Sequence, residues 1–267
     1  MVITLPDPDA PAPPRGLVKV AEVPTWRWLS LAAIAAAIGH LYLNSLHSGS
    51  TLGQLLTARS AGIAPPLPLA AGVLVALLGY AVFQHAESQR FIRVYDRVSR
   101  HLVAIAVLWS AQLVAAEHSL ELATATICLL SVLAISAYLR VHGEIAANRA
   151  PRWIGLPFAL LVGYSSFVAV GALDASIAAA GCPSVAPTIA MLVALAAITI
   201  GSSLRASDPA LPTLIAWLVT SVPAAHRSVV NVEGTALIAG ALCAAVAVLI
   251  VATRFAAPTQ HRHPARR

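Results

Sequence analysis

The sequence contains few charged residues: Asp, Glu, Lys and Arg together make up 10% of its 267 residues. Aromatic residues are also scarce, at 6%. Hydrophobic residues account for 58% of the chain, and the mean hydropathy is +0.80. A soluble domain of this size does not carry so many apolar side chains. The net charge of +6 therefore does not indicate a soluble nucleic-acid-binding protein. The composition predicts a polytopic membrane protein.

The three cysteines are too few and too scattered to build a disulfide framework. Cys128 and Cys243 fall in the middle of apolar stretches, and no two cysteines share a metal-ligand spacing, so we interpret them as small apolar residues. Hydrolase, metalloprotease and phosphate-loop motifs are missing from the sequence as well. Haem ligation needs two histidines at matched depth on different helices, and His40 has no such partner. We therefore expect no enzymatic activity and no cofactor.

Eight apolar stretches follow one another along the chain. They lie at approximately 28–46, 67–83, 101–117, 120–140, 154–178, 186–204, 210–225 and 234–254. Most hold about 17–25 residues, which suffices to cross ~30 Å of hydrocarbon at 1.5 Å per residue. A spanning segment must satisfy its own backbone hydrogen bonds, so each is expected to be helical. We predict an all-α bundle of about eight transmembrane helices over residues 28–255, with a disordered cytoplasmic tail at 1–27 and a polar cytoplasmic tail at 256–267.

The basic residues fall in alternate gaps between these stretches. Of the 17 Lys and Arg, only Arg59 and Arg227 lie in the other set of gaps. Loops that stay in the cytoplasm are enriched in Lys and Arg, so the pattern predicts that both termini are cytoplasmic. The dominance of Ala, Val and Arg over Ile, Lys and Asn indicates a GC-rich bacterial genome and hence a bacterial plasma membrane.

The segment 85–100 is amphipathic. Its arginines recur at spacings of three and four and share one helical face: Arg90, Arg93, Arg97 and Arg100. Its apolar residues cover the other face: Phe91, Val94, Tyr95 and Val98. We predict a helix lying in the membrane interface, with the arginines directed toward lipid phosphates. A cytoplasmic anchor and a regulatory lipid or anion site are both consistent with this pattern.

Polar side chains at membrane depth are costly and usually face the interior of a bundle. Three of the predicted spans place such side chains between mid-membrane and the outer surface, which predicts a pocket between spans one, three and five. Its predicted ligand-binding residues are His40, Asn44, Trp109, Gln112, Tyr164 and Asp174. Residues nearer the helix ends, such as Glu117 and His118, are expected to meet water or lipid headgroups.

Two pairs of small residues at a spacing of four predict close helix contacts. They are Ala159 with Gly163, and Gly240 with Ala244. Glycine and alanine allow two backbones to approach, because they carry little or no side chain between the helices.

The fifth span resembles a known family. Leu156-Pro157-Phe158, Gly163-Tyr164, Ser166-Phe167-Val168-Ala169 and Ala172-Leu173-Asp174 are similar to the fifth helix of the TspO/MBR tryptophan-rich sensory proteins. Pro65-Pro66, Trp109 and Ser136-Ala137-Tyr138-Leu139-Arg140 resemble elements of its second, third and fourth helices, and Asp208 and Trp217 have the spacing found in a longer branch with three added helices. The resemblance covers about residues 28–255. It implies a five-helix core plus three helices, and ligands of the porphyrin or sterol type.

The leading functional hypothesis is an integral membrane protein that binds, senses or transports a small hydrophobic ligand. The alternatives are a non-catalytic membrane scaffold or subunit, and a proton-coupled permease that uses Asp174 or Glu117. An empty cavity between spans one, three and five favours binding or transport, whereas a tightly packed interior favours the scaffold. Membrane lipids and the hydrophobic ligand are the expected partners. Nucleic acid is not expected, and a homo-oligomer is left open.

Overall fold

The computed structural model describes residues 25–47, 67–85, 93–147, 149–181, 185–220 and 230–256. These residues form α-helices and one short 3-10 helix, and no strand occurs among them. The elements are α1 (Thr25–His47), α3 (Leu67–Phe83), α4 (Arg93–His118), α5 (Leu120–Ala146), η2 (Arg152–Gly155), α6 (Leu156–Ala179), α7 (Val185–Ala206), α8 (Ala210–Thr220) and α10 (Val230–Ala256). The predicted all-α class is confirmed, and the two predicted tails lie almost entirely outside the described residues.

Each predicted apolar stretch corresponds to one α-helix. Five of the described helices are long and apolar enough to cross a membrane: those that contain Val98–Ala116, Leu120–Ala146, Arg152–Ala179, Val185–Ala206 and Val232–Arg254. Two further apolar helices are shorter, at Leu69–Phe83 and Ala210–Thr220. The chain is therefore a multi-pass membrane protein.

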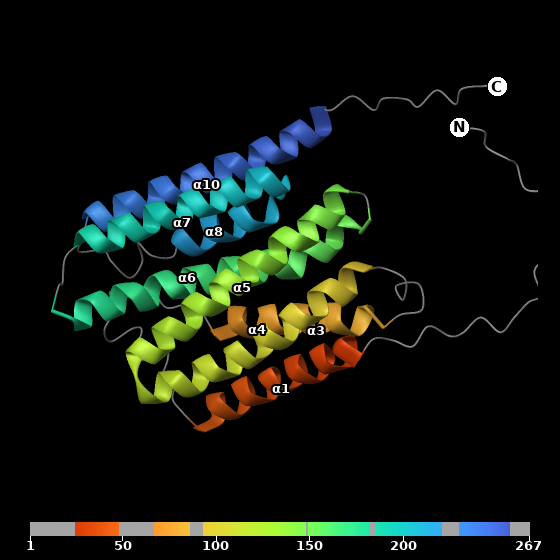
Figure 1. Ribbon diagram of the computed structural model, residues 1–267. Helices are drawn as coiled ribbons and strands as arrows, with labels where there is room; N and C mark the ends of the chain where they lie inside the picture. The colour runs from red at the N-terminus through yellow and green to blue at the C-terminus, as the bar shows by residue number, and fades with distance from the viewer. Residues whose placement is uncertain are drawn as a thin grey trace, which may run out of the picture.

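Five helices, α1, α3, α4, α5 and α6, close into a ring, which is called the five-helix ring below. α1 packs against α3 and α4, α4 packs against α5, α5 against α6, and α6 returns to α3 (Figure 1). This arrangement confirms the prediction that spans one to five surround a common centre. The remaining helices, α7, α8 and α10, pack on one another and are called the three-helix group; α7 and α8 also pack against α6. α6 therefore belongs to both parts, and 78% of its most apolar stretch is buried.

Glycines in two helices let the backbones of the bundle approach closely. A Cβ added at Gly163 of α6 would lie 2.5 Å from Cδ2 of Leu214 on α8. A Cβ added at Gly240 of α10 would lie 3.1 Å from Cγ2 of Thr220 on α8. Both glycines were predicted as contact points. Of their predicted alanine partners, Ala159 is buried as well, whereas Ala244 is exposed.

The helix directions alternate, so the described arginines gather at one end of the bundle, called the arginine end below. α1 begins at this end and α10 finishes there (Figure 1). The loops and helix ends at the arginine end carry the basic residues Arg27, Arg93, Arg97, Arg100, Arg140, Arg149, Arg152, Arg205 and Arg254. This is the arrangement that the alternating charge pattern predicts.

The segment 85–100 differs from the prediction of a separate interfacial helix. Residues from Arg93 onward form the first turns of α4 and continue into the span without a break. Tyr95 and Val98 are fully buried, so these two residues of the predicted apolar face pack against protein and not against lipid. Arg90 and the side chains of Arg93 and Arg97 lie outside the described part of the structure. Arg100 is exposed, and its guanidinium carbon lies 5.3 Å from the ring centre of Trp26.

Candidate functional site

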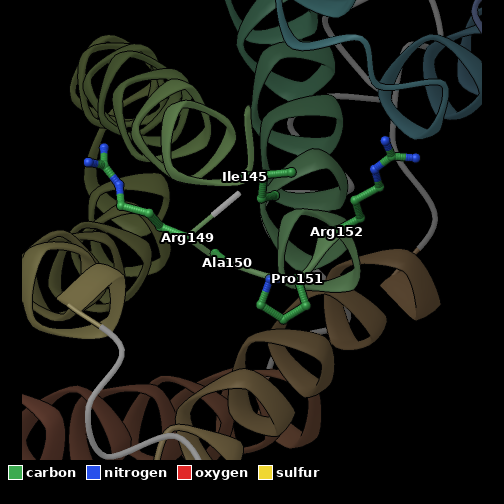
Figure 2. Close-up of a pocket in the computed structure, with 5 residues that line it drawn as sticks. All are labelled: Ile145, Arg149, Ala150, Pro151 and Arg152. Atoms are coloured by element: carbon green, nitrogen blue, oxygen red, sulfur yellow. The ribbon is translucent and has the colours of Figure 1, made fainter. Parts of the chain in front are cut away.

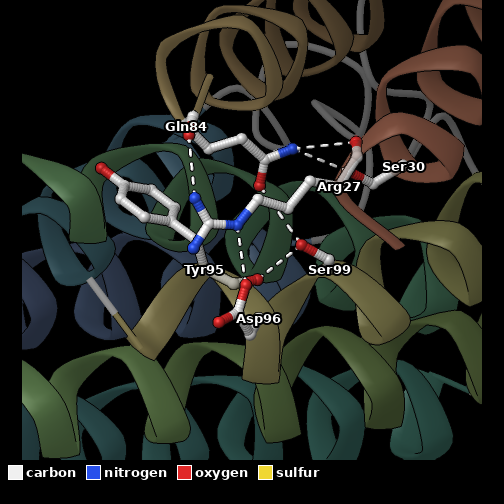
Figure 3. Close-up of polar contacts among 6 residues, drawn as sticks. All are labelled: Arg27, Ser30, Gln84, Tyr95, Asp96 and Ser99. Atoms are coloured by element: carbon white, nitrogen blue, oxygen red, sulfur yellow. Dashed lines mark hydrogen bonds and ion pairs between the residues drawn. The ribbon is translucent and has the colours of Figure 1, made fainter. Parts of the chain in front are cut away.

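A buried arginine joins three helices at the arginine end. Arg27 of α1 is 0% exposed, and its Nε donates a hydrogen bond to Oδ1 of Asp96 on α4 over 2.7 Å (Figure 3). Its Nη1 donates to the backbone carbonyl of Gln84, which follows α3, over 3.1 Å. The guanidinium also lies over the ring of Tyr95, 5.4 Å from its centre. A buried charge is tolerated only when it is paired and hydrogen-bonded, and Arg27 has both kinds of partner.

The Gln84 side chain continues this network. Its amide nitrogen donates to the carbonyl of Arg27 over 3.1 Å and to the hydroxyl of Ser30 over 2.9 Å. Its amide oxygen accepts a hydrogen bond from Ser99 over 3.2 Å (Figure 3). The network therefore ties the starts of α1 and α4 to the end of α3. In the sequence, Arg27 counts only as one of the basic residues that indicate topology, and no pattern singles out Asp96.

Burial perturbs the ionisable groups beside this network. It raises the pKa of Tyr95 to about 12, against the opposing effect of the Arg27 charge. It lowers the pKa of His85 from its usual value; the Arg27 backbone opposes this shift, and the charge of Arg27 adds to it. The His85 ring lies against Trp28, with 4.1 Å between ring centres. At neutral pH both groups are therefore uncharged.

The middle of the five-helix ring is occupied by two stacked aromatic rings. Trp109 of α4 and Tyr164 of α6 lie 5.1 Å apart between ring centres, with 15° between their planes. Both side chains are buried. A flat ligand inserted between them would need the faces roughly 7 Å apart, twice the 3.5–4.0 Å contact distance between carbon atoms. In this state the two rings stack on each other, and no ligand ring lies between them.

A third predicted site residue lies beside this stack. Gln112 follows Trp109 by one turn of α4 and is 2% exposed. A buried polar side chain is costly unless it is hydrogen-bonded. Three predicted site residues that carry polar atoms, Trp109, Gln112 and Tyr164, are thus buried in the five-helix ring.

The other predicted site residues fall into two groups. His40 is half-buried on α1 and lies 13 residues after Arg27. Trp109 likewise lies 13 residues after Asp96, the ion-pair partner of Arg27. At 1.5 Å per residue, His40 and Trp109 therefore both lie about 20 Å from that ion pair. His40 therefore lies at the depth of the aromatic stack. Asn44 belongs to α1, but its side chain lies outside the described part of the structure.

Asp174 is separate from the aromatic stack. It lies about 15 Å beyond Tyr164 along α6, and its Oδ1 accepts a hydrogen bond from the hydroxyl of Thr188 on α7 over 2.6 Å. Nearby, the hydroxyls of Thr124 on α5 and Ser176 on α6 lie 2.8 Å apart. The structure therefore places Asp174 in a polar contact between α6 and α7.

A second buried polar cluster joins the five-helix ring to the three-helix group. Tyr138 of α5 donates a hydrogen bond to Oδ2 of Asp208 over 3.0 Å, and Nε2 of His142 lies 3.5 Å from the same oxygen. The other carboxylate oxygen accepts from the backbone N–H of Ala210 at the start of α8, as an N-cap. Gly155 makes room for the imidazole, because an added Cβ would lie 2.8 Å from Nε2 of His142. In the sequence, Asp208 stands out by its spacing to Trp217, whereas His142 is marked only by its place one turn after Tyr138.

The described residues include no group of three His, Cys, Asp or Glu side chains that could hold a metal ion. Cys243 is buried and Cys128 partly buried, as expected for small apolar residues.

Comparison with known proteins identifies the family. No curated protein and no solved structure matches the chain. A family model described as "TSPO-like protein" matches residues 27–254, which include the five-helix ring and the three-helix group. The match confirms the resemblance seen in the fifth span, and the chain belongs to the TSPO-like protein family.

Proposed function

We propose that the protein binds a small, flat hydrophobic molecule inside the five-helix ring, for sensing or transport and without enzymatic turnover. The observation that carries this proposal is the stack of two buried aromatic rings, Trp109 on Tyr164, with the buried amide of Gln112 one turn away. A ligand with an apolar ring and one or two polar groups matches these aromatic faces and this amide. Membership of the TSPO-like family supports a porphyrin- or sterol-like chemistry.

Binding requires the aromatic stack to open. When the Trp109 and Tyr164 side chains rotate apart, each offers an aromatic face to the ligand. The Gln112 amide then hydrogen-bonds a polar group of the ligand, and His40 lies at the same depth to add another contact. The closed stack is the resting state, and part of the binding free energy is spent in opening it.

The proposal is tested by titrating the purified protein with a porphyrin and following the quenching of its tryptophan fluorescence. A sterol is then added to displace the bound porphyrin. Tyr164→Ala and Trp109→Ala should each weaken binding by about 1–3 kcal/mol, the value of a well-buried aromatic contact. Gln112→Leu should weaken it by about 1–3 kcal/mol if the amide pairs with the ligand. Trp217→Ala is the matched control, because Trp217 is 56% exposed on α8.

Asp174→Asn is a second control. It alters a predicted site residue that lies about 15 Å from Tyr164 along α6, so porphyrin affinity should not change. Loss of affinity in Asp174→Asn but not in Gln112→Leu would move the ligand to the α6–α7 contact.

A membrane scaffold is the second candidate, and the closed stack of Trp109 on Tyr164 favours it. In a scaffold the two rings serve only to pack α4 against α6. No saturable binding would then be found at micromolar ligand, and Trp109→Ala would lower the free energy of unfolding without any effect on affinity.

The proposed location is a bacterial plasma membrane, with the arginine end in the cytoplasm. The gathering of the described arginines at one end supports this orientation. An impermeant thiol reagent added to intact cells should label a cysteine placed at position 60, and should not label one placed at position 147, which is exposed at the arginine end.

A further inference from the structure

The turn between α5 and α6 forms an open depression at the arginine end. Its volume is about 400 Å³, and it is lined by Ile145, Arg149, Ala150, Pro151 and Arg152. Figure 2 shows the two arginines on opposite sides, with Ala150 and Pro151 between them. We propose that this depression binds the anionic headgroup of a membrane phospholipid, with Arg149 and Arg152 as the phosphate ligands.

The charge of the depression is positive. Arg149 is held by one carboxylate, through a 2.7 Å bond from its Nε to Oε2 of Glu144. A guanidinium carries five N–H donors, so the donors on its terminal nitrogens are not used by this bond. Arg152 is exposed and makes no ion pair with a described residue. Two guanidinium groups against one carboxylate leave a site that attracts a phosphate.

The backbone that carries the arginines is fixed. The N–H of Arg149 bonds to the carbonyl of Glu144 over 2.9 Å, and the N–H of Ile154 bonds to that of Pro151 over 3.2 Å. Ile154 is fully buried, and the Trp153 ring meets Phe83 of α3 edge-on, 4.5 Å between centres. The two arginines are therefore presented by an ordered turn, which lowers the entropy lost when a headgroup binds.

Apolar side chains next to the depression favour a lipid over a soluble phosphate. Trp153 is 46% exposed and Leu156 is 51% exposed, and both follow Arg152 within one turn of chain. Tryptophan with its ring partly exposed is typical of the membrane–water interface. A phospholipid satisfies both features at once, since its phosphate meets the guanidinium groups while its acyl chains cover Trp153 and Leu156.

Native mass spectrometry of the full-length protein, released from mixed micelles, measures this binding. The probes are phosphatidylglycerol, which is anionic, and phosphatidylcholine, which is zwitterionic. Loss of a charge-assisted hydrogen bond to the phosphate is expected to reduce affinity about tenfold. Arg152→Gln should therefore reduce retention of phosphatidylglycerol about tenfold, and Arg149→Gln with Arg152→Gln about 100-fold. Retention of phosphatidylcholine should not change.

Two further variants sharpen the test. Arg140→Gln is the matched control, because Arg140 is exposed near the same end of α5 and does not line the depression, so its phosphatidylglycerol retention should equal that of the unmodified protein. Glu144→Gln removes the carboxylate that competes for Arg149, and retention should rise. This opposite sign distinguishes a headgroup site from general loss of folding.

Three results would overturn the proposal. Equal retention of the two lipids, or equal losses in Arg140→Gln and Arg152→Gln, would show that the arginines act only through the general charge of this end. Displacement of phosphatidylglycerol by millimolar inorganic phosphate would assign the depression to a soluble anion instead of a lipid.

Discussion

Replacing Gly163 by alanine adds one methyl group where α6 crosses α8. The new Cβ would lie 2.5 Å from Cδ2 and 3.2 Å from Cγ of Leu214, and 3.6 Å from Cδ1 of Leu211. Carbon atoms in contact prefer 3.5–4.0 Å, so the end of the Leu214 side chain must move by about 1 Å or more. Leu214 is only partly buried and has some room to turn, whereas Leu211 is fully packed.

The expected effect is a net loss of stability. Overpacking of this kind costs about 1–3 kcal/mol, and alanine in place of glycine inside a helix recovers about 1 kcal/mol. Gly163→Ala should therefore lower the free energy of unfolding by about 0–2 kcal/mol. The matched control is Gly201→Ala in α7, where an added Cβ meets nothing within 4 Å. That variant gains the helical preference alone and should be unchanged or up to about 1 kcal/mol more stable.

Reversible unfolding in mixed micelles, followed by circular dichroism, measures both variants. A double variant, Gly163→Ala with Leu214→Ala, should be more stable than the sum of the two single changes predicts, by at least about 1 kcal/mol, because the new methyl takes up space that Leu214 vacates. Equal stability of Gly163→Ala and Gly201→Ala, together with strict additivity in the double variant, would refute the close approach of α6 and α8.

Three further changes test the polar contacts. Asp96→Asn should cost about 2 kcal/mol of folding free energy, between the values for buried and exposed ion pairs. The reason is that Arg27 is fully buried whereas the Asp96 side chain is 44% exposed. Thermal unfolding equal to that of Glu233→Gln, a charge change away from the network, would contradict this. Asp208→Asn should cost about 1–3 kcal/mol, since it weakens both the bond from Tyr138 and the cap of α8, and unchanged stability would show that the cluster does not hold the two parts together. The pKa of His85 is lower in the folded protein than in the unfolded chain, so the unfolded chain binds the proton at higher pH. The free energy of unfolding should therefore be unaffected by His85 above about pH 6.5 and should fall as the pH drops toward the folded-state pKa. His85→Gln should flatten that part of the pH profile. A slope that persists in His85→Gln would assign it to another group.

The helices could be predicted from the sequence because a membrane allows so few alternatives. α3 has the predicted bounds, 67–83, and most other helices differ from prediction by a few residues at each end. The apolar run sets the length of a span, and the arginines mark its ends. The start of α4 could not be predicted in the same way. Tyr95 and Val98 form an apolar face that fits lipid as well as protein, and only the packing of α1 and α3 decides between them.

The candidate site could be predicted in part, for a physical reason. Buried polar residues turn inward, which brings Trp109, Gln112 and Tyr164 together. The same rule does not say which interior they face. Asp174 lies on α6, which borders both the five-helix ring and the three-helix group, and its partner Thr188 belongs to α7. The sequence carries no mark of that choice.

Two neighbouring residues of α6 show how the two parts of the bundle constrain each other. Gly163 faces Leu214 of α8, while Tyr164 stacks on Trp109 of α4. Consecutive residues of a helix point about 100° apart, so α6 is held on two different sides at this level. On the α8 side there is no room for even one added methyl group. Movement of the whole helix is therefore costly, and under the proposed function we expect rotation of the Trp109 and Tyr164 side chains to be the cheaper way to admit a ligand.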